Sequence, residues 1–211
     1  MKEYKLPIGC DVPETIILAD GDFPSHPLAL EWLRQCPYVV CCGGAANTYI
    51  RSGRMPEAIV GDGDSLLPDI KERYASLIHS EAEQETNDLS KAFRFCLSQE
   101  RKRITIMGAT GKREDHTIGN VSLLADYMEQ AEVSMMTDYG IFVPIREDSM
   151  FESYIGQQIS VFNMNSTALS AEGLAYPLSV FTNWWQGTLN EALARHFIIR
   201  TEGKVLVFRV F

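Results

Sequence analysis

The sequence has no long uninterrupted apolar run and no cluster of basic residues. No stretch approaches the roughly 18 apolar residues of a membrane-spanning helix, and Met1–Lys5 contain no hydrophobic signal-peptide core. We therefore expect a cytoplasmic protein that does not enter a membrane. The 19 Lys and Arg residues face 28 Asp and Glu residues, for a net charge of −9. This acidic balance argues against binding to a nucleic-acid backbone, so we expect no nucleic-acid partner.

Cysteine is scarce and irregularly spaced. The five cysteines form no C-x-x-C pair, which argues against a zinc site or a dithiol redox centre. They are better explained as buried free thiols: Cys10, Cys36, Cys41, Cys42 and Cys96. A hydrophobic content of 45% over 211 residues argues against disorder and is enough for one core or two small ones.

Four short apolar runs each end in a loop that carries glycine or carboxylate residues. They cover 15–19, 38–42, 58–61 and 103–107. Helices are expected between them, over 26–35, 70–77 and 117–128, with another beginning at Thr86 or Asn87. This alternation predicts a parallel α/β sheet whose loops meet at the carboxyl edge, where ligands bind.

The most informative loop follows the third run. It reads Gly61-Asp62-Gly63-Asp64-Ser65, with two carboxylates separated by one glycine. Two anions on one tight loop indicate a cation, and Mg²⁺ prefers carboxylate and phosphate oxygens. The alternative is an acidic surface turn that caps the helix near Pro68.

The other loops carry groups suited to phosphate. Gly43, Gly44 and Asn47 open a helix whose free N–H groups attract anions, although a structural turn explains them equally well. Asp88 and Lys91 are either a solvated i, i+3 pair or a metal ligand with a phosphate partner.

The loop after the fourth run is rich in glycine and charge. Lys112 and Arg113 can bind phosphate, and Asp115 or His116 can orient them. The alternative for His116 is a helix cap or a packing residue.

The pattern changes near residue 138. Short β-like segments punctuated by glycine follow, at 141–145, 158–162, 174–178, 196–200 and 205–210. We expect a Rossmann-like α/β domain over 1–137, followed by a small antiparallel β-sandwich over 138–211.

Taken together, these motifs resemble the thiamine pyrophosphokinase family. The resemblance rests on 41–47, 56–65, 84–91 and 108–116, which occur in the family's order, with a weaker match at 188–191. It implies an ATP-binding α/β catalytic domain, a thiamine-binding sandwich and a homodimer with substrate near the subunit interface. It also implies transfer of pyrophosphate from ATP to the hydroxyl of thiamine.

The resemblance assigns roles to residues of this chain. Asp62, Asp64 and Asp88 would hold Mg²⁺, with Asp64 preferred as the proton acceptor. ATP contacts would come from Gly43, Gly44, Asn47, Lys91, Arg113, Asp115 and His116. Thiamine contacts would come from Gln84 and Asn190, with Tyr176 or Trp184 or its neighbour Trp185 offering a flat face to a cationic ring.

The chain departs from the family pattern at two positions. Gly43 stands where the family usually has Asp, and Leu189 stands where it usually has Ser. Asp20 or Asp22 could compensate for the first change. Three alternatives stay open: a non-catalytic homologue that binds thiamine or nucleotide, a metal-dependent phosphohydrolase, and a pyrophosphokinase for another alcohol.

Overall fold

The protein is described by a computed structural model that covers residues 1–8, 12–81, 83 and 85–211. The chain divides into two compact units. The α/β unit contains Val12–Leu123 and Glu129–Asp138. The β unit contains the N-terminal strand β1 (Lys2–Tyr4), Leu124–Met128 and Tyr139–Phe211. Within the described ranges, no helix is both long and apolar enough to cross a bilayer.

The α/β unit is built on six parallel strands, in the order β7-β6-β2-β3-β4-β5. The strands are β2 (Thr15–Leu18), β3 (Val39–Cys42), β4 (Ala58–Gly61), β5 (Ile78–Ser80), β6 (Arg103–Met107) and β7 (Glu132–Met136). Every residue of β2, β3 and β4 is buried, as expected for strands covered on both faces. The chain leaves β2 toward β3 and later returns to its other side as β6. Strand order therefore reverses at β2, which creates a crevice at the carboxyl ends of β2 and β6.

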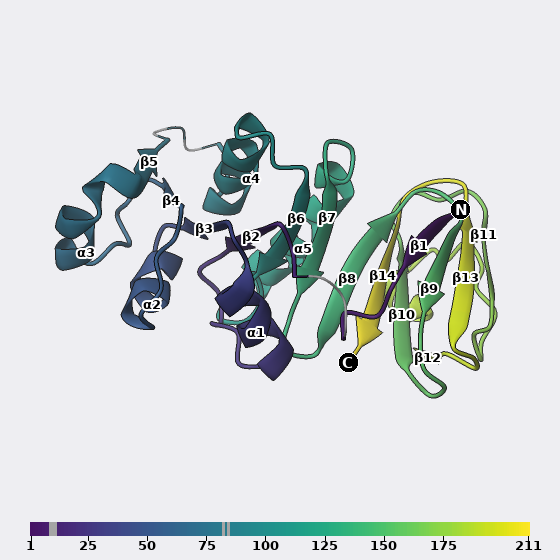
Figure 1. Cartoon of the computed structure of the whole chain (residues 1–211). Coiled ribbons are helices and arrows are strands. Elements are labelled where there is room, and N and C mark those ends of the chain that lie inside the picture. Colours follow the sequence, from purple (N-terminus) through teal and green to yellow (C-terminus); the bar gives the residue numbers. More distant parts are fainter. Residues whose placement is uncertain (9–11, 82, 84) are drawn as a thin grey trace. The chain divides into compact units, whose positions relative to one another are not determined.

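Helices connect these strands on both faces of the sheet. They are α1 (Pro27–Gln35), α2 (Ala45–Arg51), α3 (Pro68–Arg73) with a 3₁₀ turn (Ala75–Leu77), α4 (Asp88–Ser98) and α5 (Glu114–Tyr127). Figure 1 shows α1 and α2 on one side of the strands and α4 on the other. The helices thus bury both apolar faces of the sheet, and the loops that enter α2, α4 and α5 gather at its carboxyl edge.

The β unit is a two-sheet sandwich. One sheet has the order β1-β9-β13-β11, and the other strands are adjacent in the order β12-β10-β14-β8. Their bounds are β1 (Lys2–Tyr4), β8 (Gly140–Ile145), β9 (Ser149–Glu152), β10 (Gln158–Asn163), β11 (Leu169–Glu172), β12 (Asn190–Glu191), β13 (His196–Thr201) and β14 (Val205–Val210). The core between the sheets includes Phe151, Phe197, Val161 and Val207, all at most 1% exposed.

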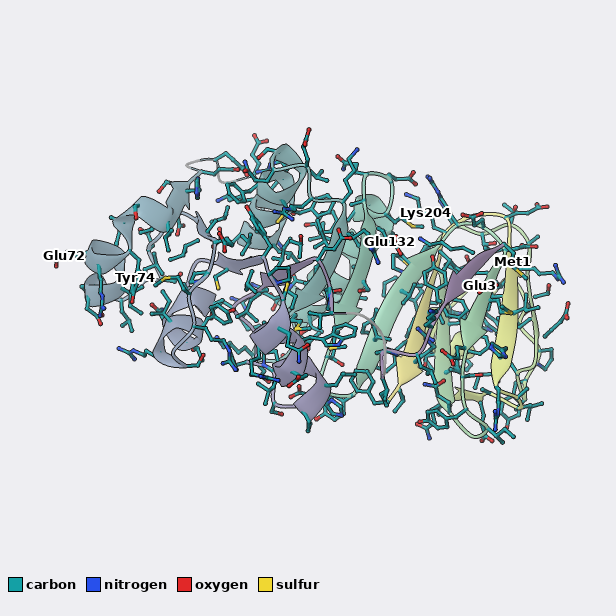
Figure 2. The ribbon with its side chains drawn as sticks, in the orientation of Figure 1. Met1, Glu3, Glu72, Tyr74, Glu132 and Lys204 are labelled. Atoms are coloured by element: carbon teal, nitrogen blue, oxygen red, sulfur yellow. The ribbon has the colours of Figure 1, made fainter. Side chains whose placement is uncertain are left out.

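The structure confirms a mixed α/β chain with a C-terminal β region, and it differs from the sequence prediction within residues 174–178 and at the N-terminus. Residues 174–178 do not form a strand; Leu174 makes only an isolated bridge to Ala192. Pro177 in that segment has no N–H to donate to a ladder. Residues 2–4, which fall in the range expected for the α/β domain and were not predicted to be a strand, form β1. This strand pairs in parallel with β9, so Glu3 lies opposite Met150; Figure 2 labels Glu3 on this strand.

Candidate active site

A cavity of about 440 Å³ lies within the α/β unit at the carboxyl ends of β2, β3 and β6. Its lining comes from five segments that are far apart in the sequence. It includes Asp20, Gly44, Ser65, Asn87, Asp88, Lys112, Arg113, His116 and Asn120. The predicted meeting of the loops at one edge therefore holds for the loops after β2, β3, β4 and β6 and for the start of α4.

Two glycines make room for the Asp88 carboxylate. A Cβ on Gly61 would lie 2.7 Å from Asp88 Oδ2, and a Cβ on Gly43 would lie 2.9 Å from the same atom. Both glycines have positive φ, 147° and 31°. The sequence therefore uses glycine at the ends of β3 and β4 because a carboxylate from α4 fills the space that side chains would occupy.

The start of α4 fixes Asp88 and Lys91. Asn87 caps the helix by accepting a hydrogen bond from Ser90 N (2.9 Å). Lys91 is 2% exposed, and its Nζ lies 3.6 Å from Asp88 Oδ1. The pair is therefore not a solvated surface pair.

Negatively charged neighbours of Asp88 outnumber positively charged ones. Burial raises the pKa of the Asp88 carboxyl; Lys91 opposes this shift, and the charges of Asp62 and Asp20 add to it. An arriving cation would relieve this repulsion.

The Asp62-Gly63-Asp64 loop is shaped by its own hydrogen bonds. Asp64 N donates to Asp62 Oδ1 (3.0 Å), and Lys71 Nζ donates to the carbonyl of Gly63 (3.2 Å). Both carboxylates are exposed. The loop thus keeps two carboxylates in solvent at the end of β4, although neither side chain lines the cavity described above.

The loop after β6 and the first turn of α5 carry Arg113, Asp115 and His116. Arg113 donates hydrogen bonds to the Asp115 carboxylate from Nε (3.1 Å) and Nη2 (2.6 Å), and this hydrogen bonding lowers the pKa of Asp115. His116 is exposed and donates its backbone N–H to Asp115. The pairing engages Nε and Nη2 of Arg113; a guanidinium has five N–H donors, so further donors remain for a phosphate.

Three asparagines hold the walls of the cavity together. Asn47 donates to Ser65 O (2.8 Å) and accepts from Leu67 N (3.0 Å), which ties α2 to the loop after β4. Asn120 donates to Ala109 O (2.8 Å) and accepts from Asn87 (3.2 Å). The sequence analysis included Asn47 but missed Asn120 as a site residue, because its partner Asn87 lies 33 positions earlier in the chain.

The residues predicted for thiamine lie in the β unit, except Gln84. Gln84, like Cys10, lies outside the described residues. Asn190 is 4% exposed, and its amide pairs with the backbone of Tyr176 in both directions (2.8 and 3.0 Å). Tyr176 and Trp184 are 64% and 44% exposed. The structure thus gives Asn190 a local structural role and leaves the two aromatic faces accessible.

The acidic residues suit a hard divalent cation. In the described part of the chain, no group of three or more His, Cys, Asp or Glu side chains is already clustered as a metal site. The carboxylate chemistry nevertheless fits Mg²⁺, because Asp88 is half-buried beside the negative charges of Asp62 and Asp20. Carboxylates that repel one another are expected to close around a cation only when it is bound.

Two family models match the chain. A family model described as "Thiamin pyrophosphokinase, catalytic domain" matches residues 29–136. A second, "Thiamin pyrophosphokinase, substrate-binding domain", matches residues 140–208. The two matches fall on the α/β unit and on the β unit, respectively.

Individual relatives carry the same description. The chain is 31% identical over 129 residues to "Thiamine pyrophosphokinase 1" of Oryza sativa subsp. japonica, a match that covers 49% of each protein. It is 35% identical over 81 residues to "Thiamine pyrophosphokinase" of Bacillus subtilis, covering 36% of this chain and 38% of that protein. The chain thus spans about half or less of the length of these curated relatives.

Solved structures share the whole fold. The structure of thiamin pyrophosphokinase from Candida albicans matches with a TM-score of 0.79 at 17% identity, covering 100% of this chain and 93% of that one. The yeast structure matches with a TM-score of 0.80 at 16% identity, covering 100% and 91%. At these identities the likeness concerns the fold alone.

Proposed function

Because this chain belongs to the thiamin pyrophosphokinase family, we propose that it transfers the pyrophosphoryl group of ATP to the hydroxyl of thiamine. The products are thiamine diphosphate and AMP. The observation that carries the proposal is the cavity in which Asp88, Lys112 and Arg113 meet. Paired anionic and cationic groups at the carboxyl edge of a parallel sheet suit a nucleotide triphosphate with its metal.

The triphosphate is placed in this cavity. Lys91 and Arg113 supply positive charge, and Gly43 and Gly44 let the backbone approach the phosphates where α2 begins. Asn47 supports this wall through its hydrogen bonds, while Asp115 and His116 border the nucleotide. The strand-order reversal at β2 supports a Rossmann-like assignment for this sheet.

Asp62, Asp64 and Asp88 are the residues that would hold Mg²⁺. When bound, the ion would neutralise negative charge on the phosphates. The alternative of a simple acidic turn does not account for Asp88, which approaches Gly61 of the same loop from a different helix.

The chain's part in the reaction is alignment and proton transfer. The thiamine oxygen attacks the β-phosphorus, the bond from that phosphorus to the oxygen bridging to the α-phosphorus breaks, and AMP leaves with the electron pair. The proton of the thiamine hydroxyl passes to a carboxylate, for which we propose Asp64. Its exposed carboxylate, held in a turn by Asp62, is accessible to an incoming hydroxyl.

We assign thiamine binding to the β unit. We also propose that the active form is a homodimer. The aromatic faces of Tyr176 and Trp184 are exposed and suit a cationic ring. Asn190 positions Tyr176 through two hydrogen bonds to its backbone. Gln84 is retained as a substrate contact from the family resemblance.

Phosphorus NMR of the protein with ATP, Mg²⁺ and thiamine tests the proposal. We expect AMP and a new diphosphate ester to appear together. Formation of ADP or free phosphate would identify a simple kinase or a hydrolase instead. Unchanged ATP, with thiamine or ATP still raising the melting temperature, would identify a non-catalytic binding protein.

A further inference from the structure

An ion pair between Asp20 and Lys112 lines the cavity, and the proposed function assigns no role to Asp20 or to this pairing. Lys112 Nζ lies 3.1 Å from Asp20 Oδ1 and 2.8 Å from the backbone oxygen of Asp20. The side chains are 54% and 48% exposed. Exposed pairs contribute little to folding stability, so stability alone does not explain this contact.

The backbone on both sides of the pair is held firmly. Gly21 N donates to Gly108 O (2.6 Å) and Asp22 N donates to Thr110 O (2.9 Å), which joins the loop after β2 to the loop after β6. A Cβ on Gly21 would collide with the carbonyl oxygens of Gly108 and Thr110. Asp20 therefore occupies a fixed place in the crevice where strand order reverses.

The Asp20 carboxylate points to the part of the cavity where phosphate and cation are expected. Its second oxygen, Oδ2, would lie 2.5 Å from a Cβ on Gly44, so it rests against the start of α2. Asp88 lies against the neighbouring residue, Gly43. The two carboxylates thus flank one Gly-Gly pair from different loops.

Lys112 adopts a backbone conformation that disfavours a side chain. Its φ is 56°, in the left-handed region, which residues other than glycine adopt only at a cost in stability. The chain accepts this cost at a position that brings an ammonium to Asp20. An ammonium can be exchanged between carboxylate and phosphate oxygens, because both accept charge-assisted hydrogen bonds from it.

We propose that Asp20 is a further positioning carboxylate of the site and that Lys112 is its exchangeable counter-charge. In the ligand-free protein Lys112 neutralises Asp20. When a divalent cation arrives with a polyphosphate, Lys112 moves to a phosphate oxygen and Asp20 turns to the cation or its bound water. The inference rests on the proposed function, because it assigns the same cavity to a metal polyphosphate.

Two substitutions give effects of opposite sign on cation binding. Calorimetry would measure the affinity for Mg²⁺ alone and then for Mg·ATP without thiamine. Lys112→Gln should tighten binding of Mg²⁺ alone by about fivefold, because a competing cation is removed. It should weaken binding of Mg·ATP by about tenfold, because a charged contact to phosphate is lost. Asp20→Asn should weaken binding of Mg²⁺ alone.

The same two strands provide a matched control at their opposite ends. Arg103 begins β6 and Glu14 precedes β2, and their ion pair measures 2.7 Å with side chains that are 64% and 54% exposed. Arg103→Gln should change neither affinity. In the Asp20→Asn background, Lys112→Gln should no longer tighten Mg²⁺ binding.

The outcomes separate this inference from the proposed function. The exchange is overturned if Lys112→Gln leaves Mg²⁺ affinity unchanged or lower, or if the parent protein binds no Mg²⁺. That result is compatible with formation of thiamine diphosphate, which would retain the function. Opposite effects of the two substitutions, accompanied by a different phosphorus product, would support the exchange and reject the function.

Discussion

Gly43 lies where neighbouring side chains already fill the space that a side chain of its own would need. A side chain there would meet Ser65 Oγ at 2.8 Å and Asp88 Oδ2 at 2.9 Å, and the backbone φ is 31°. The family's Asp at this position therefore does not fit beside Asp88 in its present place. The carboxylates of Asp20 and Asp88 already occupy the two sides of the Gly-Gly pair.

We predict that Gly43→Asp lowers both stability and activity, although restoring a missing carboxylate would by itself be expected to raise activity. Gly43→Ala should lower the free energy of unfolding by at least about 1 kcal/mol because of the left-handed backbone. Gly43→Asp should cost more, because it adds an anion beside Asp88. Urea denaturation and turnover measure both effects. Gly53→Ala is the control: its φ is 82° and no atom lies within 4 Å of the added Cβ. A more active Gly43→Asp enzyme would contradict this view of the site.

A second prediction concerns Asp64. Asp64→Asn should reduce turnover by about a hundredfold or more, the usual scale for losing a general base, while the urea midpoint stays unchanged because the side chain is exposed. Asp69→Asn, an exposed change five positions later in the first turn of α3, should leave turnover intact. Normal turnover in Asp64→Asn would remove this residue from the reaction.

At the scale of single residues, the sequence predicted candidate site residues where they lie close together in one segment. The Asp62-Gly63-Asp64 loop and the Asp88, Lys91 pair are visible as spacing within one segment. The contacts of Asn120 with Asn87 and of Lys112 with Asp20 join residues 33 and 92 positions apart. Such pairs arise from the order of strands in the sheet, which a single sequence does not specify.

At the scale of elements, the N-terminus of α4 couples helix stability to the site. We predict that Asn87→Ala lowers the free energy of unfolding by about 1 kcal/mol, through loss of the hydrogen bond to Ser90 N. It should also weaken Mg·ATP binding, because the next residue is Asp88. His26→Ala is a suitable comparison, since His26 accepts from Leu28 N at the start of α1, outside the cavity lining. Calorimetry should show weaker Mg·ATP binding for Asn87→Ala and unchanged binding for His26→Ala; equal effects would contradict the coupling.

A buried tyrosine between α2 and α1 predicts a loss of stability in alkali. Tyr49 is 3% exposed, and its hydroxyl donates to Leu33 O at 3.5 Å. Burial raises the pKa of Tyr49 to about 12. A raised pKa means that the stabilising contribution is complete below about pH 10, the value for a free tyrosine, and is lost as pH rises toward 12.

Tyr49→Phe should make unfolding less sensitive to alkali. Between pH 8 and pH 11 the parent should lose about 1.4 kcal/mol more than this variant, which corresponds to one pH unit of protonation difference. Urea denaturation at the two pH values measures the change. Tyr139→Phe alters a ring that is 79% exposed and should follow the parent. Equal losses in the parent and Tyr49→Phe would show that Tyr49 does not control this transition.

Elements were predictable where an apolar run was long enough to stand out. The four strands predicted by residues 15–19, 38–42, 58–61 and 103–107 are present as β2, β3, β4 and β6. Strands β5 and β12 have three and two residues, too few for a periodic pattern. Helix α5 begins at Glu114, three residues before the predicted start, because its first turn is polar and exposed.

At the scale of the whole molecule, the change from alternating α/β segments to short β segments indicated two architectures. It did not indicate that β1 pairs with β9, a contact between residues about 147 positions apart in sequence. The pairing depends on Arg209, 2% exposed, which donates to the carbonyls of Lys5 (2.9 Å) and Glu152 (2.8 Å). A buried arginine that satisfies backbone oxygens of two distant segments leaves no local pattern in the sequence.

The β unit exposes more large apolar side chains than a solitary domain requires. Six lie between residues 176 and 193, with exposed fractions from 44% to 76%: Tyr176, Val180, Trp184, Trp185, Leu189 and Leu193. Apolar groups concentrated in one segment favour association, because burying them removes apolar area from water. We therefore predict a homodimer that uses this segment.

Analytical ultracentrifugation across a range of concentrations tests that prediction. The parent should sediment as a dimer, and Leu189→Lys or Trp185→Lys should shift it toward the monomer, because each places a charge where apolar surface would be buried. Met55→Lys, at a residue that is 58% exposed in the α/β unit, should leave the dimer intact. Since a dimer is stabilised by mass action, the melting temperature of the parent should also rise with protein concentration, and that of the monomeric variants should not. A parent that stays monomeric at every concentration would assign these side chains to substrate contact alone.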